Sequence, residues 1–477
     1  MSKNKLYLYT GIIFISLTYV ACKIPAVTSK TENKTVPGYF TASQDSAAKS
    51  VVKWKEYFTD KYLDALIDTA LKNNQELSIA LQEIEIARNE IKARKGEYLP
   101  FVGVKVGAGV DKAGRYTNIG AMEANTDIKE GKEMPDPMPD LQIAAYATWE
   151  ADIWHKLHNA KKAAVNRYLA TIEGRNFVIT NLIAEIANSY YELLALDNQL
   201  EIVNKNIDIQ NNALQIVKAQ KEATRVTELA VRKFEAEVLN TRSLQFGIRQ
   251  QITETENRIN FLLGRYPQHI DRDDKAFENG MPGVIQAGIP SQLLTNRPDI
   301  RQAEQELAAL KLDVKVAKAK FYPQLAISAS VGYQAFNPAY LFTTPASLIY
   351  SLAGELLSPL INRNAIKASY FNANAKQVQA VYNYERTILN AYVEVVNQMN
   401  KMDNLAKSYD LKSKQVLALT QSIDISNDLF KSARADYMEV LMTQRDALES
   451  KFELIETKKQ QLNAMVNIYQ ALGGGWN

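Results

Sequence analysis

The side chains best suited to chemistry are His155 and His158, which stand three residues apart at the start of a predicted helix. That spacing is compatible with a metal ion shared by two imidazoles, but no cysteine or third histidine lies near them in the sequence. We therefore expect no metal site and no cofactor. A phosphate-binding glycine loop, a nucleophile elbow and a Cys–His pairing signature are also absent from the sequence. These observations favour a protein that is not an enzyme.

The single cysteine, Cys22, follows a segment typical of a secretory signal. Lysines precede an apolar run over residues 6–20, which is short for a membrane-spanning helix, and the small residue Ala21 comes last. A cysteine in this place resembles the bacterial lipoprotein signal, in which the cysteine carries lipid such as palmitate and becomes the mature N-terminus. Tyr19 departs from the leucine that is usual three residues before that cysteine. Lipidation of Cys22 is our hypothesis, and a simple cleaved signal is the alternative.

Composition places the chain among folded proteins without a strong charge. It has 477 residues, of which 46% are hydrophobic and 23% charged, and a formal net charge of +3. So small a net charge gives no argument for nucleic acid as a partner. No long apolar run follows the signal, so a helical membrane protein is not expected. One cysteine excludes an intramolecular disulfide.

Two long segments carry the pattern of extended coiled-coil helices. Residues 364–472 contain neither glycine nor proline, and a helix from about 364 to 430 would be roughly 100 Å long at 1.5 Å per residue. Apolar residues recur every seven positions, which holds one helix face against a neighbour. The same pattern occurs earlier in the chain, so we predict long helix pairs at about 160–264 and 364–472 and an internal two-fold repeat. The matching positions are Ile179, Ile186, Leu193, Leu200, Ile207 and Leu214 in the first copy, and Ile388, Val395, Met402, Tyr409, Val416 and Ile423 in the second.

Four segments alternate between apolar residues and small or polar ones, the pattern of strands with two different faces. They lie at about 101–111 and 141–151 and, in the second half, at about 324–334 and 347–357. Four such strands cannot close a barrel, and their unpaired edges would not be tolerated in lipid. Three copies would supply twelve strands, with apolar residues outward and a wide, watery lumen. The alternative is an ordinary soluble sheet whose apolar face packs on helices.

The repeat also predicts how the chain is divided. Within its first half we expect one helical stretch from Trp54 to Lys95 and a long exposed loop from Met122 to Asp140. Each repeat would contain a helix, two strands and a long helix pair. The predicted parts are a signal peptide at 1–21, a lipidated leader at 22–53, a first repeat at 54–266, a linker at 267–296 and a second repeat at 297–477.

Four short segments, Trp149–Asp152, Asn296–Glu304, Phe321–Pro323 and Ala471–Trp476, form a recognisable series of motifs. In this order they resemble the outer membrane factors of Gram-negative efflux systems, specifically the OprM-like, NodT-type lipoprotein branch related to TolC. The similarity covers nearly everything from Trp54 onward. It implies an α+β membrane protein and a homotrimer, in which a twelve-stranded outer-membrane β-barrel continues into a long periplasmic α-helical barrel. The N-terminus would be anchored in outer membrane lipid.

The same resemblance implies transport rather than catalysis. We expect an outer membrane exit duct that passively conducts small toxic compounds, as in multidrug resistance. In the family, an inner-membrane pump, often of the resistance-nodulation-division (RND) type, delivers the substrates through a periplasmic adaptor, or membrane fusion protein. The rival within transport is the outer membrane duct of a type I protein secretion system. Outside transport, the rival is a periplasmic coiled-coil scaffold.

The family's periplasmic gate aligns with a segment near residue 440. The resemblance places Met438 and Met442 at the constriction and Arg445 one turn beyond. Relatives often carry an aspartate where Met442 stands, so methionine favours a hydrophobic constriction over a cation-attracting ring. Ordinary packing of the methionines in a helix seam is the alternative.

Two turns, at the ends of the two long helices, match the family's adaptor contacts. Relatives commonly have glycine where threonine or alanine stands here, which leaves the geometry of these turns open. The arginines would donate hydrogen bonds to adaptor carbonyls or carboxylates, and ordinary solvated arginines are the alternative. The residues are Thr224, Arg225 and Val226 in the first turn and Ala433, Arg434 and Ala435 in the second.

Overall fold

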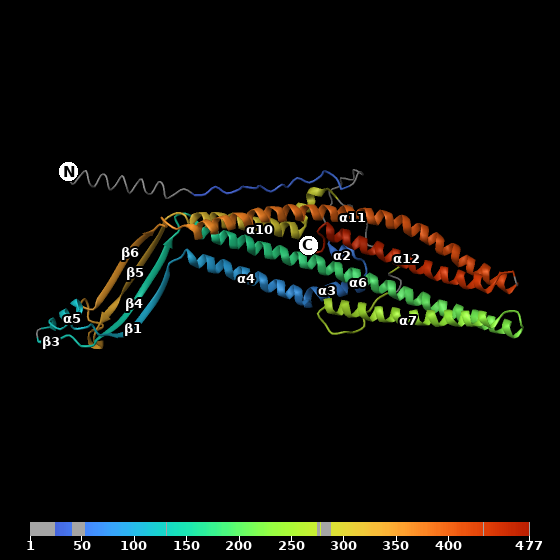
Figure 1. Ribbon diagram of the computed structural model, residues 1–477, viewed down its shortest axis with the longest axis horizontal. Coiled ribbons are helices and arrows are strands. Elements are labelled where there is room, and N and C mark those ends of the chain that lie inside the picture. The colour runs from blue at the N-terminus through green and yellow to red at the C-terminus, as the bar shows by residue number, and fades with distance from the viewer. Residues whose placement is uncertain are drawn as a thin grey trace. The chain divides into compact units, whose positions relative to one another are not determined.

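The computed structural model describes residues 24–40, 53–129, 131–273, 277, 288–432 and 434–476. They form two compact units, whose elements are labelled in Figure 1. The long helices α6 (Lys156–Glu222) and α11 (Asn364–Lys431) contribute to both units. The first unit takes in the leader up to Thr31 with residues 85–169 and 305–382, and the second takes in residues 32–84, 170–304 and 383–477.

The first unit is built on one antiparallel sheet with the strand order β1-β4-β5-β6 (Figure 1). Its strands are β1 (Phe101–Asp111), β4 (Met138–Ala151), β5 (Gln324–Ala335) and β6 (Leu348–Leu357). The register places Val104 opposite Ala145, and Ala145 opposite Val331. Because side chains alternate across a strand, this register gathers the apolar positions of all four strands on one face.

That apolar face is open to the surroundings within one chain. Val102, Val104 and Val106 are 68–74% exposed, and Tyr350 and Leu352 about 80%. The opposite face carries small and polar side chains, including Ser330 and Ser351, whose hydroxyl oxygens are 2.8 Å apart. The alternation predicted from the sequence is confirmed. Among the described residues, no helix covers the apolar side of these exposed strands, so they do not form the ordinary sheet packed on helices.

The segment between β1 and β4 is more regular than the predicted loop from Met122 to Asp140. It contains the helix α5 (Asn118–Glu123) and a two-stranded ribbon of β2 (Asp127–Lys129) and β3 (Lys132–Glu133). β4 begins at Met138, before the predicted start at 141. It tolerates Pro139 because β5 pairs with β4 only from Leu141 onward, so this end of β4 has a neighbour on one side only.

The expected helix over residues 54–95 is in fact three helices: α2 (Trp54–Tyr57), α3 (Lys61–Asn73) and α4 (Gln75–Glu97). Two side chains divide them. The carboxylate of Asp60 accepts a hydrogen bond from the backbone of Tyr62 at 2.8 Å, and the amide oxygen of Asn74 accepts one from Leu77 at 2.9 Å. Each residue caps a new helix start, which the apolar spacing alone did not reveal.

The second half of the chain has the same order of elements as the first. A short turn, η1 (Pro290–Gln292), and α9 (Leu293–Asn296) lead into α10 (Pro298–Ala319), which precedes β5 as α4 precedes β1. The turn η2 (Pro338–Tyr340) lies between β5 and β6. The returning helices are α7 (Glu228–Leu262) and α12 (Tyr437–Ala471). Among the helices of the described residues, none combines the length and apolar character needed to cross a membrane.

The main core of the second unit gathers aromatic and aliphatic side chains from α2, α3, α6, α7 and α12. Tyr57 stacks on Tyr469 with ring centroids 4.4 Å apart, and its hydroxyl donates to the carbonyl of Met465 at 2.8 Å. Ile186 and Leu193, two positions of the seven-residue repeat, are fully buried in this core. The heptad pattern thus marks the face that each long helix turns toward its neighbours.

Candidate functional site

The turn between α6 and α7 ends the first helical hairpin with a geometry that usually requires glycine. Thr224 has a φ of +52°, in the left-handed region. Its N–H donates to the carbonyl of Lys221, and the N–H of Arg225 donates to the carbonyl of Gln220, both at 2.9 Å. These two bonds form a Schellman motif, which satisfies the last carbonyls of α6. The turn therefore keeps the glycine-type geometry although a threonine occupies it, at a cost of about 1–2 kcal/mol.

The turn between α11 and α12 repeats the second of these bonds, which joins residues five positions apart. The N–H of Arg434 donates to the carbonyl of Leu429 at 2.8 Å, five residues earlier, as Arg225 does to Gln220. Ala433, which corresponds to Thr224, lies outside the described residues. Ala435 follows directly, and α12 begins two residues later at Tyr437. Two helical hairpins thus end in matching turns, and Figure 1 shows these turns at one end of the second unit.

At the two turns, which we call the tips, some charged side chains form ion pairs and others do not. Lys221 forms an ion pair with Glu228, and this hydrogen bond lowers the pKa of the Glu228 carboxyl. Arg232 also pairs with Glu228, at 2.8 Å. In contrast, Arg225 and Arg434 are exposed, and neither guanidinium has a partner among the residues that the structure describes. Two donor-rich cations are therefore free for an external acceptor.

An apolar cluster holds the two hairpins together below these turns. Val217 of α6, Phe234 of α7 and Val440 of α12 are almost completely buried in it. The cluster fixes the rotation of α12 about its own axis. One face of α12, with Val440, Leu441 and Gln444, is turned into the bundle.

The residues predicted for the gate lie on the other face of α12. Met438 and Met442 are 38% and 49% exposed, and the side chain of Arg445 is 60% exposed. Their spacing of four and then three residues puts all three on one stripe of the helix. The structure thus brings them together and leaves them outside the core of the single chain, where they are available to a pore or to a neighbouring chain.

The leader runs beside α11. In the first unit, Ile24 and Val27 pack against an apolar cluster that contains Phe321 and Tyr370, and the amide nitrogen of Asn374 donates to the carbonyl of Thr28 at 3.1 Å. In the second unit, the ammonium of Lys34 contacts the carboxylate of Glu304 at 2.5 Å. The leader is therefore part of the fold and not a loose tail. Cys22, the predicted lipid attachment site, lies outside the described residues.

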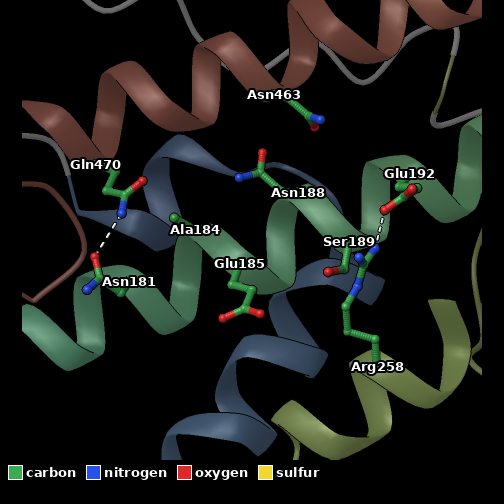
Figure 2. Close-up of a pocket in the computed structure, with 9 residues that line it drawn as sticks. All are labelled: Asn181, Ala184, Glu185, Asn188, Ser189, Glu192, Arg258, Asn463 and Gln470. Atoms are coloured by element: carbon green, nitrogen blue, oxygen red, sulfur yellow. Dashed lines mark hydrogen bonds and ion pairs between the residues drawn. The ribbon is translucent and has the colours of Figure 1, made fainter. Parts of the chain in front are cut away.

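A polar cavity of about 320 Å³ opens between α6, α7 and α12 in the second unit (Figure 2). Arg258 forms an ion pair with Glu192 on one wall, and Gln470 donates to the amide oxygen of Asn181 at 2.8 Å on another. The side-chain oxygen of Asn463 is buried without a partner in the described chain. A wall of amides and carboxylates favours water and hydrophilic solutes over apolar ones. No pattern in the sequence indicates this cavity, because its residues come from three separate helices.

Asp152, which the sequence marks only as the end of the Trp149–Asp152 motif, is a further candidate site residue. It stands three positions before His155, and the structure brings its carboxylate together with both histidines, His155 and His158. Burial alone would raise the pKa of Asp152, but hydrogen bonds from the backbone of His158 and Leu157 and from the His158 ring lower it below its ordinary value. An aspartate directly after a strand and at the start of a helix was the available signal.

Comparison with solved structures identifies the fold. The fold matches the outer-membrane channel OprN with a TM-score of 0.82 and 22% identity, over 95% of this chain and 99% of that one. It matches a crystal structure of CusC with a TM-score of 0.81 and 22% identity, over 94% and 99%. The open state of the MtrE channel of Neisseria gonorrhoeae gives 0.80. The fold is that of an outer-membrane channel.

Comparison of sequences then identifies the family. The family described as "Outer membrane efflux protein" matches residues 66–265 and 289–474, and the chain belongs to this family. The pyoverdine export outer membrane protein OpmQ of Pseudomonas aeruginosa is 28% identical over 437 residues, which cover 92% of this chain and 90% of OpmQ. SilC of Salmonella typhimurium, a probable outer membrane lipoprotein, is 24% identical over 92% and 93%. The chain is an outer membrane efflux protein of the tripartite kind, a channel and not an enzyme, as the sequence predicted.

Proposed function

We propose that this protein is the exit duct of a tripartite efflux system. Three chains would form a homotrimer, in which a twelve-stranded outer-membrane barrel continues into a periplasmic helical barrel. The observation that carries this proposal is the sheet of the first unit, since its exposed apolar face is suited to lipid and its outer strands β1 and β6 lack a second neighbour among the residues that the structure describes. A barrel closed by three copies would place the apolar face in lipid and would pair β1 and β6 of neighbouring chains.

The repeated order of elements supports a chain made of two repeats. The first would span residues 54–266 and the second 297–477, with the segment 267–296 as the linker. Each repeat would give the trimer two strands and one helical hairpin per chain. The pairing of β4 with β5 joins the two halves within one sheet, so closure would need only β1 of one chain to meet β6 of the next.

We assign adaptor contact to the two tips. Arg225 and Arg434 are exposed and unpartnered within the described chain, and each follows a tight turn that fixes its backbone. Guanidinium groups held in this way can donate paired hydrogen bonds to carbonyls or carboxylates of a periplasmic adaptor. The adaptor would connect the duct to an inner-membrane pump of the RND type. Thr224, Val226, Ala433 and Ala435 would shape the contact around the arginines.

The cargo we propose is small toxic compounds. Relatives of this chain carry names that refer to pyoverdine export, to toluene and solvent efflux, and to cation efflux. All of these are small molecules or ions, which favours efflux over the alternative, a type I protein secretion duct. A periplasmic coiled-coil scaffold, the other alternative, leaves the apolar face of the sheet unexplained.

We place the gate on the exposed stripe of α12. Met438 and Met442 would line or seal the periplasmic constriction with apolar side chains, and Arg445 would follow one turn further along the helix. This assignment rests on the family alignment and on the exposure of the three side chains in the single chain. A ring of methionines would block water and ions by lack of polar groups, not by charge.

We also propose that Cys22 is lipidated and anchors the N-terminus in the outer membrane. The support is the position of the leader, because Ile24 packs against the apolar cluster that contains Phe321, and Phe321 stands three residues before β5 begins. A lipid on Cys22 would therefore emerge beside the base of the strands. The relative SilC is named as an outer membrane lipoprotein, which agrees with this reading.

Photo-crosslinking in intact cells tests the proposed function. A crosslinking residue would replace Arg225 or Arg434, and a matched control would replace Arg88, an exposed arginine of α4. We expect the two tip positions, and not the control, to capture an adaptor together with an RND pump. Capture of an ATP-binding cassette exporter, together with loss of a secreted protein in a knockout that keeps its dye resistance, would establish protein secretion instead. A soluble monomer with no envelope partner would overturn the channel altogether.

A further inference from the structure

Asp152, His155 and His158 form a compact cluster where β4 passes into α6. One ligand atom from each residue, a carboxylate oxygen and two imidazole nitrogens, lies within 4.8 Å of the others. The closest approach is 2.6 Å, between Asp152 Oδ2 and His158 Nδ1. The rings of the two histidines are nearly perpendicular, with centroids 6.0 Å apart. The chain has three histidines in all, and two of them are in this cluster.

The cluster is held in place by its surroundings. The carboxylate of Asp152, only 6% exposed, accepts hydrogen bonds from the backbone of Leu157 at 3.0 Å and of His158 at 2.8 Å. The ring of Tyr98 stacks on His158 at 4.5 Å between centroids. A carboxylate has about four lone-pair sites, so the backbone bonds leave acceptor capacity on Asp152. Lys156, the nearest lysine in sequence, is engaged by Glu150 at 2.5 Å.

The backbone conformation of His155 is a further unusual feature of this cluster. Its φ of +54° lies in the left-handed region, where histidine is disfavoured relative to glycine. A bend of the same hand occurs before α11, where Asn362 has a φ of +53°. That bend is flanked by Pro359 and Ala365 at the distances that separate Asp152 and His158 from His155. Such a junction therefore folds without a carboxylate and without histidines, so folding alone does not account for the three residues.

We propose that Asp152, His155 and His158 bind one divalent transition cation of the Zn²⁺ or Cu²⁺ class per chain. Imidazole nitrogen and carboxylate oxygen are preferred ligands of these ions, at about 2.0–2.2 Å for zinc. The ion would take the place of the proton shared between Asp152 and His158, and small rotations of exposed His155 would complete the set. A fourth position would stay open to water, as both histidines are exposed. The site would fix the strand-to-helix junction of β4 and α6, and it does not depend on the proposed function.

The test uses purified full-length protein with a tag that contains no histidine. Calorimetric titration with Zn²⁺ and absorption titration with Co²⁺ measure stoichiometry and ligand class without any transport assay. We expect one ion per chain, a Co²⁺ spectrum typical of nitrogen and oxygen ligands, and a higher midpoint temperature of unfolding with Zn²⁺.

The decisive variant is His155→Gly, because glycine favours the left-handed backbone and so keeps the bend. We expect it to fold and to bind Zn²⁺ at least about tenfold more weakly, since loss even of an outer-shell partner costs roughly 10–100-fold. Asn362→Gly makes the same backbone change at the junction without ligands, and His269→Ala removes the remaining histidine; both should bind as the parent protein does. No binding by the parent protein, or unchanged binding by His155→Gly, would overturn the proposal.

Discussion

Arg297 and Asp299 form a two-pronged ion pair at the start of α10, with Nε to Oδ1 at 3.0 Å and Nη2 to Oδ2 at 2.8 Å. The remaining nitrogen, Nη1, donates to Glu394 at 2.8 Å and to the carbonyl of Ala471 at 2.7 Å. One buried side chain therefore joins the start of α10 to the middle of α11 and the end of α12. This arrangement explains why the motif around Arg297 and the glycine-rich ending of the chain occur together. Gly473 lies so close to the carbonyl of Asn296 that a Cβ at this position would clash with it, and the φ of Gly473 is +84°.

We expect Arg297→Ala to lower the free energy of unfolding by about 3 kcal/mol, because it leaves the partly buried carboxylate of Asp299 without its cation and the carbonyl of Ala471 without its donor. Arg297→Lys should restore only part of the loss, since lysine cannot form the two-pronged pair. Arg88→Ala, which breaks an exposed pair with Glu85, should cost at most about 1 kcal/mol. Denaturant unfolding of the purified variants measures all three. Equal shifts for Arg297→Ala and Arg88→Ala would contradict the role of Arg297.

The sequence was sufficient where local pattern and tertiary environment agree. The alternation around Val104 and Val331 predicted both strands and their faces, because a sheet that turns one side to lipid imposes a strict period of two. The local apolar pattern gave a wrong prediction where a single side chain determines where a helix begins. Asp60 and Asn74 divide a helix that the apolar spacing left continuous, and their capping bonds are visible only once the backbone is placed.

Polar burial was the other feature that sequence could not supply. Gln444 stands only two residues after Met442 and looks like a surface residue in the sequence. It is buried because α12 rotates Val440 and Leu441 into the tip cluster, and Gln444 follows them. Asp152 escaped notice for a related reason, since its partnership with His158 depends on the turn that ends β4. The burial of Gln444 and the pairing of Asp152 with His158 depend on tertiary structure and not on composition or on the hydrophobic period.

Thr224→Gly should stabilise the tip of the first hairpin. Glycine removes about 1–2 kcal/mol of left-handed strain from the folded state. It also makes the unfolded chain more flexible, which costs about 0.5–1 kcal/mol. The expected net gain in stability is about 0.5–1 kcal/mol. Hydrogen exchange of the Arg225 amide, which donates to Gln220, should slow roughly two- to fivefold. Thr227→Gly is the matched control, because Thr227 has an ordinary φ of −87° and gains nothing from glycine. Faster exchange in Thr224→Gly would show that the threonine is not strained.

Gln444→Met should raise the free energy of unfolding by about 1–3 kcal/mol, the cost of leaving a buried polar group unsatisfied. Both amide atoms of Gln444 lack a partner in the described chain, and the side chain is 1% exposed. Methionine has a similar length and no polar atoms to satisfy. Gln460→Met is the control, because the amide of Gln460 already donates to Glu456 at 2.9 Å, and it should bring no gain. Destabilisation by Gln444→Met would mean that a neighbouring chain satisfies the amide.

Cys22→Ser should abolish labelling of the protein by a fatty-acid probe, because the serine offers no thiol for lipid attachment. We expect the variant to remain in the outer-membrane fraction, since the apolar face of its strands would still be held in lipid. Gel fluorescence after labelling, together with membrane fractionation, measures both outcomes. Persistent labelling of the serine variant would rule out Cys22 as the attachment site.

Met442→Asp should make the channel more selective for cations. If Met442 lines the constriction, a trimer of this variant carries a ring of three carboxylates there, and such a ring attracts cations and repels anions. Single-channel recordings in lipid bilayers under a salt gradient measure the change as a shift in reversal potential. Leu229→Asp, which places the same charge on an exposed position of α7, is the control and should leave the reversal potential near that of the parent. If Met442→Asp also leaves it unchanged, Met442 contacts a neighbouring helix and the gate lies elsewhere on α12.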